Sequence, residues 1–204
     1  PHGRCSYCPG GRDTPQSYTG KEPAGLRGDM YGYDPFLQTR SRLDALARNG
    51  HPLDKIEAIV MGGTFMARNR NYRQKFVKGV FDGLNDFIAK DLAEAMGINE
   101  GAGSRCVGLT IETRPDYAEP IEMLELGATR VELGVQTIYD DVLDGVKRGC
   151  TVEDTVKTTK RLKDSGFKVC YHLMPGLPGS DFQRDLEMFK TIFKDERLKP
   201  DMLK

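Results

Sequence analysis

The sequence predicts an α/β fold in which helices cover a parallel β-sheet. Apolar runs at residues 56–61, 106–111, 130–135 and 167–173 alternate with segments of helical periodicity, an order typical of β-α-β units. Each run ends in glycine or polar residues, as strands do at the mouth of a parallel barrel. No Gly-x-Gly-x-x-Gly follows any run, which weakens the doubly wound alternative. We therefore expect a barrel-like arrangement of strands.

The other segments follow in order along the chain. Residues 1–34 are rich in Gly, Pro, Tyr and Ser without an apolar period, so we expect a long ordered loop, which in compact domains is usually functional. The helix expected over 35–48 has Pro35 in its first turn and Gly50 after its end. Further helices are expected over 71–96, 119–126, 139–147, 152–164 and 181–194. Residues 202–204 resemble the beginning of another strand.

Composition argues against several classes of protein. The 30 basic and 30 acidic residues among 204 cancel, so any nucleic-acid site must be a local patch. No apolar run approaches the ~20 residues that span a bilayer, and no signal peptide is present, so we expect a cytoplasmic protein. The odd count of five cysteines argues against a disulfide framework. Pro1 in place of an initiating Met suggests a fragment.

The pair Cys5-Ser6-Tyr7-Cys8 is the sharpest local signal. Two thiolates at this spacing suit an iron–sulfur cluster, a redox-active pair or half of a zinc site. The residues Pro9-Gly10-Gly11 oppose the helix that a redox pair needs, and no second pair at ligand spacing supports zinc. The two cysteines alone leave all three interpretations open. The remaining cysteines are interpreted as structural: Cys106, Cys150 and Cys170.

Motifs spread over the whole chain resemble one known family, that of the catalytic subunit of Elongator in its compact archaeal form. The matching segments are Pro1–Gly11, Gln16–Gly20, Tyr33–Arg40, Val60–Met66, Thr110–Tyr117, Glu132–Thr137 and Asp164–Val169. The resemblance implies a partial, TIM-like (β/α) barrel of the radical S-adenosylmethionine (SAM) type, incomplete at both ends. It assigns residues 1–34 to an N-terminally truncated iron–sulfur cluster loop and 35–204 to the barrel. It also implies a C-terminal acetyltransferase domain that is absent from these residues.

The same resemblance assigns cofactors and their ligands. It implies that Cys5 and Cys8 hold a [4Fe–4S] cluster together with a third cysteine just before Pro1, and that the open iron binds SAM. The residues implied to bind SAM are Tyr7, Gly62, Gly63, Thr64, Glu112, Gln136 and Arg148. Alternatives remain for some of them, because Arg114 could simply pair with Glu112 and Arg148 could cap a helix. We expect His172 to be a half-buried histidine whose hydrogen bonds are satisfied.

A basic run follows the Gly62-Gly63 turn. Residues 66–78 carry five cations and no acid, interleaved with Tyr72 and Phe76. Such a run could hold tRNA phosphates and stack on a base, although charge runs are more often solvated faces. The residues expected to contact tRNA are Arg68, Arg70, Arg73, Lys75 and Lys78.

The activity that the resemblance implies is formation of the 5-carboxymethyl group on the wobble uridine of tRNA. The implied co-substrate is acetyl-CoA, which the absent domain would mainly bind, and accessory subunits are possible partners. Two alternatives stay open. One is a radical SAM enzyme with a small-molecule substrate, and the other is a non-catalytic tRNA-binding scaffold that has lost its cluster.

Overall fold

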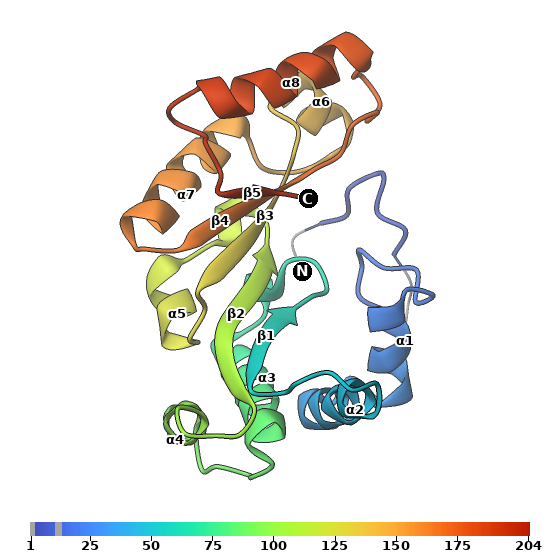
Figure 1. The fold of residues 1–204 in the computed structure, drawn as a ribbon. Coiled ribbons are helices and arrows are strands. Elements are labelled where there is room, and N and C mark those ends of the chain that lie inside the picture. Colours follow the sequence, from blue (N-terminus) through green and yellow to red (C-terminus); the bar gives the residue numbers. More distant parts are fainter. Residues whose placement is uncertain (1–2, 11–13) are drawn as a thin grey trace.

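A parallel sheet is the centre of the fold. The computed structural model describes residues 3–10 and 14–204. The described strands lie side by side in sequence order, all parallel, and form a partial barrel that is not closed (Figure 1). They are β1 (Lys55–Val60), β2 (Arg105–Thr113), β3 (Arg130–Gln136), β4 (Lys168–Leu173) and β5 (Met202–Leu203). The expected α/β class and barrel-like arrangement are confirmed.

Helices connect the strands, as β-α-β units require. The described helices are α1 (Pro23–Met30), α2 (Pro35–Arg48), α3 (Arg70–Asn85), α4 (Leu92–Asn99), α5 (Pro120–Glu125), α6 (Asp140–Gly145), α7 (Val152–Asp164) and α8 (Phe182–Lys194), with the 3₁₀ helices η1 (Phe65–Ala67) and η2 (Pro115–Tyr117). Side-chain oxygens cap several of the α-helices at their first turns: those of Asp34, Asn69, Asp91, Thr151 and Asp181. None of the described helices is both long and apolar enough to cross a bilayer.

The two faces of the sheet differ in character. On one face Ile111, Val131, Leu133, Val169 and Tyr171 are fully buried in the apolar core beneath the helices. There α3 packs on β2, and α7 packs on β3 and β4. Because side chains alternate along a strand, the residues between these point to the other face, toward the N-terminal segment (Figure 1). That face carries polar side chains: Glu112, Glu132, Cys170 and His172.

The expectation of a single helix over 71–96 is wrong. Asp86 ends α3 in the left-handed conformation, with φ 53°, and the Asp91 side chain begins a separate helix, α4. Phe87 and Ile88 extend the apolar periodicity in the sequence, but they lie in the connection between the two helices and are 53% and 64% exposed. Apolar spacing cannot reveal a residue that leaves the helical conformation, so the periodicity runs through a real break.

The loop expected over 1–34 is interrupted by α1, so that expectation is wrong for residues 23–30. Pro23 occupies the first turn of this helix, a position that proline favours. The helix buries only Gly25 and Gly28 and therefore shows no apolar period in the sequence. The remaining described part of 1–34 is loop, as expected.

Candidate functional site

The cysteine pair lies on a tight turn that is docked on the barrel. The backbone N–H of Ser6 donates to Val146 O at 2.9 Å, and that of Cys8 donates to Cys5 O at 3.1 Å. Cys5 is buried and Cys8 half-buried. Burial and the neighbouring Cys5 thiol raise the pKa of Cys8, whereas Arg148 acts to lower it. Two thiols are thus held next to each other, beside a cation.

Arg148 joins this turn to strand β3. Its Nη1 lies 3.5 Å from Cys5 Sγ, and its Nη2 donates to Gly134 O. A Cβ added at Gly134 would lie 2.5 Å from Arg148 Nη2 and 3.0 Å from Gln136 Nε2, so both side chains converge over this glycine. Arg148 is 7% exposed, and its Nε has no hydrogen-bond partner among the described residues. An unpaired buried N–H marks a place where a ligand can accept.

Gln136 stands at an irregular strand end. Its φ is 72°, an uncommon conformation for a residue other than glycine, and the register of β3 with β4 shifts between Leu133 and Gln136. The Gln136 carbonyl accepts from Met174 N at 2.8 Å, which anchors the end of β3 to the chain beyond β4. Backbone strain of this kind is typical of functional sites.

The turn after β1 approaches the site from the other side. Gly62 and Gly63 have φ of 127° and 95°, which favour glycine. Added Cβ atoms would lie 3.4 Å from Pro15 Cβ and 3.2 Å from Ser17 Oγ, so the N-terminal segment covers this turn closely. The Gly62 N–H donates to Glu112 Oε2 at 3.2 Å. Glu112 is therefore held by the glycine turn, while Arg114 forms two hydrogen bonds with the carboxylate of Asp116.

The other residues expected at the cofactor lie around this centre. Tyr7 packs against Val142, Val146 and Leu177, and burial raises its pKa. Thr64 begins the 3₁₀ helix η1 directly after the glycine turn. Pro1, His2 and Gly11, which belong to the cysteine motif, are outside the described residues. The structure thus gathers the cysteine turn, Arg148, Gln136 and the β1 turn at the carboxyl ends of the strands.

A charged network on the same face was not predicted from the sequence. Glu132 is 6% exposed, and its Oε2 lies 2.6 Å from His172 Nε2 and 3.0 Å from Lys204 Nζ. Lys204 Nζ also lies 3.4 Å from Glu112 Oε1 and thereby bridges two carboxylates that are in register on β2 and β3. Burial, followed by Glu112, raises the pKa of Tyr18 to about 12, which brings the N-terminal segment into this network.

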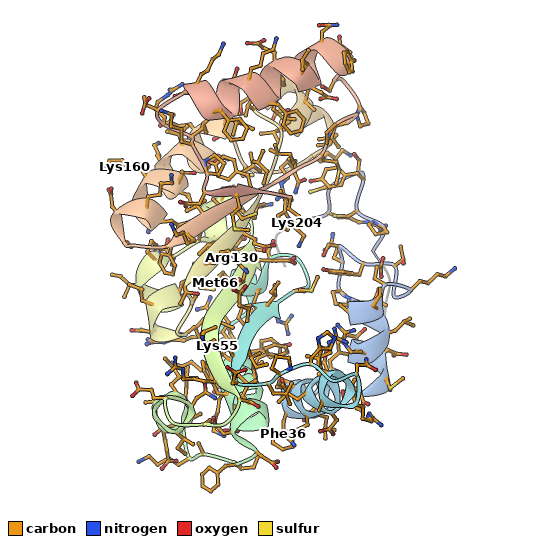
Figure 2. All side chains as sticks on the ribbon, viewed as in Figure 1. Phe36, Lys55, Met66, Arg130, Lys160 and Lys204 are labelled. Atoms are coloured by element: carbon orange, nitrogen blue, oxygen red, sulfur yellow. The ribbon has the colours of Figure 1, made fainter. Side chains whose placement is uncertain are left out.

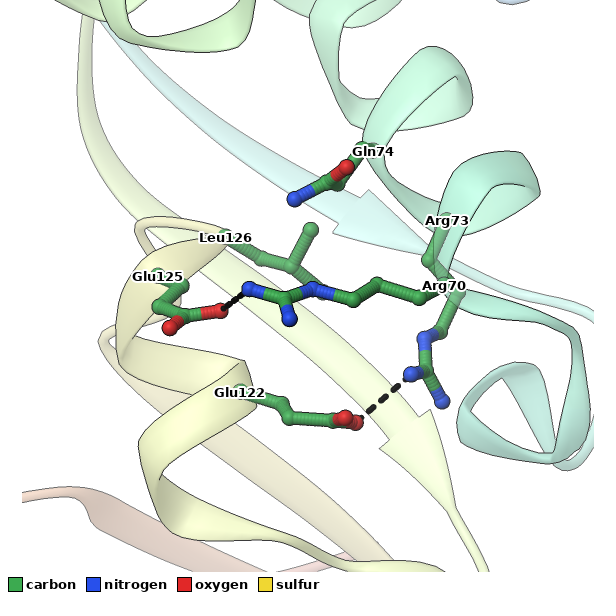
Figure 3. A pocket seen from close by; sticks show the side chains of 6 residues that line it. All are labelled: Arg70, Arg73, Gln74, Glu122, Glu125 and Leu126. Carbon is green, nitrogen blue, oxygen red and sulfur yellow. Dashed lines mark hydrogen bonds and ion pairs between the residues drawn. The ribbon is translucent and has the colours of Figure 1, made fainter.

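The basic run divides into buried and exposed residues. Arg73 is 8% exposed, donates to Met66 O and pairs with Glu122 of α5 at 2.6 Å (Figure 3). This guanidinium therefore faces the protein, contrary to its expected contact with phosphate. Lys78 pairs with the buried Asp82. The exposed cations of the run are Arg68, which stacks on Tyr72 at 4.7 Å, Arg70, which pairs with Glu125, and Lys75.

Comparison with known families agrees with this geometry. The sequence profile of the Radical SAM superfamily matches residues 2–192, nearly the whole chain. The chain belongs to the radical SAM superfamily. Members of this superfamily use a [4Fe–4S] cluster and SAM.

Within the radical SAM superfamily, the chain is similar to proteins of one family. The chain is 58% identical over its whole length to the tRNA uridine(34) acetyltransferase of Methanocaldococcus jannaschii, of which it covers 39%. It is 45% identical over 98% of its length to human Elongator complex protein 3, of which it covers 38%. The chain thus spans about two fifths of these relatives. The resemblance to the Elongator catalytic subunit is confirmed.

Solved structures give the same result. The archaeal Methanocaldococcus infernus Elp3 matches with a TM-score of 0.84 and 56% identity, over 86% of this chain and 42% of that one. Coproporphyrinogen III oxidase (HemN) from Escherichia coli matches with a TM-score of 0.57 and 17% identity, over all of this chain and 41% of that one. The second likeness concerns the fold alone.

The residues at this site fit both the [4Fe–4S] cluster and the SAM molecule that a radical SAM protein uses. Two soft sulfur donors share one turn, which suits iron in a cluster. Because Gly134 has no Cβ, the Arg148 guanidinium and the Gln136 amide can lie together over it, and the unpaired Arg148 Nε is a donor for the charged end of an amino acid.

Proposed function

We propose that this chain is the radical SAM unit of an enzyme that builds the 5-carboxymethyl group on the wobble uridine of tRNA, with acetyl-CoA as co-substrate. The similarity to a tRNA uridine(34) acetyltransferase over the whole chain supports this proposal. The single observation that carries it is the contact of Arg148 with Cys5 and Gly134, which links the cysteine turn to the strand ends. We further propose residues 1–34 as the cluster loop and 35–204 as the barrel.

Each residue of the site has a part in this proposal. Cys5 and Cys8 would hold the cluster, and Tyr7 would pack beside the bound cofactor. Arg148 and Gln136 would bind the carboxylate of SAM. The turn that contains Gly62 would lie against the rest of the methionine moiety. Gly63, Thr64 and Glu112 are proposed to make further contacts with SAM. When bound, cluster and SAM supply a 5′-deoxyadenosyl radical. The protein residues bind and orient the cofactor and exclude water from it.

We propose that the tRNA surface consists of Arg68, Arg70, Lys75 and the exposed ring of Tyr72. These side chains lie on the first turns of α3 and on the turn before it, just after the glycine turn of β1. Three cations and an aromatic ring can contact phosphates and stack on a base. Arg73 is left out because it is buried, and Lys78 because it is engaged by Asp82. Acetyl-CoA and any accessory subunits would bind mainly outside the described residues.

The test is anaerobic reconstitution of the full-length protein with iron and sulfide, followed by measurement of 5′-deoxyadenosine release. We expect tRNA to stimulate release several-fold, and the wobble uridine to gain a carboxymethyl group when acetyl-CoA is present. A rate that tRNA leaves unchanged would favour a small-molecule substrate, and failure to retain any cluster would favour the scaffold.

A further inference from the structure

Three side chains from different strands meet on the open face of the sheet. Glu132 of β3, His172 of β4 and Lys204 after β5 are brought together by the parallel register, in which Glu132 pairs with Cys170 and Cys170 with Met202. Lys204, which follows β5, is held by backbone bonds to Tyr171 and Leu173 (Figure 2). None of these three residues is among those proposed above to bind the cofactor, but Lys204 also pairs with Glu112, which is one of them.

Glu132 is the residue of this cluster that contacts both of the others. It is nearly inaccessible to water, and its Oε2 accepts from both His172 and Lys204. The hydrogen bond from His172, with help from Lys204, lowers the pKa of Glu132 to about 2, so this carboxylate stays ionised at neutral pH. An ionised carboxylate can only accept hydrogen bonds, so the proton of a neutral His172 ring must be on Nε2.

This tautomer leaves the lone pair of His172 on Nδ1. No described residue donates to Nδ1, and the His172 side chain is 23% exposed, so the ring can be reached from the open face.

We propose that His172, oriented by Glu132, is the general base that removes the proton from C5 of the target uracil. This inference rests on the proposed function. After a carbon radical has added to C5, the adduct must lose one electron and the C5 proton. The C5–H bond breaks, its electron pair restores the C5–C6 double bond, and the proton goes to His172 Nδ1. The electron goes to a one-electron acceptor of the iron–sulfur class.

Other ionisable groups face the same cluster and bear on its pH dependence. They are Glu112 and its partner Lys204, the Cys170 thiol, Arg130 at the start of β3, and Tyr18 of the N-terminal segment. Glu132, Cys170 and His172 also have donor atoms within 4.8 Å of one another, as a metal site requires. The Lys204 ammonium at 3.0 Å from Glu132 opposes a second cation there, which favours the acid–base role.

The test uses the full-length, cluster-loaded protein and tRNA that carries tritium at C5 of the wobble uridine. Tritium released to water is measured per 5′-deoxyadenosine formed. We expect His172→Gln to lower this ratio about 100-fold or more, because that is the usual contribution of a general base. His51→Gln is the matched control, since His51 is an exposed histidine beyond the end of α2. Both variants should retain the cluster absorbance.

The positioning role of Glu132 has its own readout. Glu132→Gln replaces a group that can only accept hydrogen bonds with an amide that can also donate, so the ring is no longer held in one tautomer and tritium release per 5′-deoxyadenosine should fall. Glu132→Asp should restore part of this release. A merely structural role would show no such rescue by the carboxylate.

The outcomes distinguish failure of the proposed function from failure of the assignment of His172 as the general base. Absence of tritium release by the wild type would contradict the proposed function itself. Release by the wild type and an equal ratio for His172→Gln would overturn the base assignment alone. Equal loss of 5′-deoxyadenosine and tritium would mean that His172 serves cofactor binding and would also overturn it. The base assignment would also be overturned if a variant without Cys5 and Cys8 retained a metal ion that His172→Gln loses.

Discussion

The guanidinium of Arg148 lies 3.5 Å from the sulfur of Cys5, although 143 positions separate the two residues in the chain. The same guanidinium bonds to Gly134 on β3. A single side chain therefore connects the turn that carries the two thiols with the strand ends. Changes at this connection should affect cofactor binding more than stability.

Substitution of Gly134 tests the convergence of side chains over it. In Gly134→Ala the new methyl group would lie 2.5 Å from Arg148 and 3.0 Å from Gln136, so both side chains must move. We expect the affinity for SAM, measured by calorimetry on the cluster-loaded protein, to fall about 10-fold, or about 1.4 kcal/mol. Gly145→Ala in α6 is the control, because nothing lies within 4 Å of its added Cβ. Equal affinities in the two variants would remove Gly134 from the site.

The cysteine assignment predicts a selective loss of iron. Cys5→Ala and Cys8→Ala should each lower iron content and visible absorbance after anaerobic reconstitution, because a thiolate ligand is missing. Cys106→Ala should retain both, since Cys106 is half-buried within β2. Retention of normal iron by the Cys8 variant would show that the cluster is held elsewhere.

The exposed basic surface predicts salt-dependent tRNA binding. In the double variant Arg68→Ala/Lys75→Ala, binding should weaken for every tRNA tested. The slope of log K against log salt should decrease by about 1 for each cation that no longer meets a phosphate. Lys157→Ala on α7 serves as the control, because its side chain is exposed on a different helix. A slope that matches the wild type would place the tRNA on another surface.

The charged cluster predicts a contribution to acid stability. The pKa of Glu132 is about 2 in the folded protein, below its usual value, so its contribution is complete above pH ~4.5 and is lost as the pH falls toward 2. The loss should be on the order of 2–3 kcal/mol in the free energy of unfolding. In urea titrations Glu132→Gln should show a flatter dependence on pH over this range. Identical slopes for variant and wild type would contradict the buried ion network.

Much of the geometry of the candidate site was predictable from the sequence. The apolar runs mark buried parallel strands, and such strands present their carboxyl ends on one side of a barrel. Gly62, Glu112 and Gln136 each lie at or next to such an end, so their convergence follows from the fold class. The cysteine pair alone left several metals and a redox role open, and the family resemblance distinguished among them.

The charged network was harder to predict because it depends on register. Glu132 lies inside an apolar strand, and its alternation with Val131 and Leu133 is the one signal that it faces away from the core. Its partners His172 and Lys204 come from other strands, so only the pairing of β3, β4 and β5 reveals the contacts. Likewise, the burial of Arg73 depends on α5, which the basic run does not indicate.

The bond from Ser6 N to Val146 O has a consequence for the order of events during synthesis. The cysteine turn leaves the ribosome some 140 residues before the segment on which it docks. The turn therefore stays undocked until β3 and α6 have formed. A nascent chain halted before Val146 should hold iron poorly, so we expect loading of the metal to come after this half of the barrel has folded.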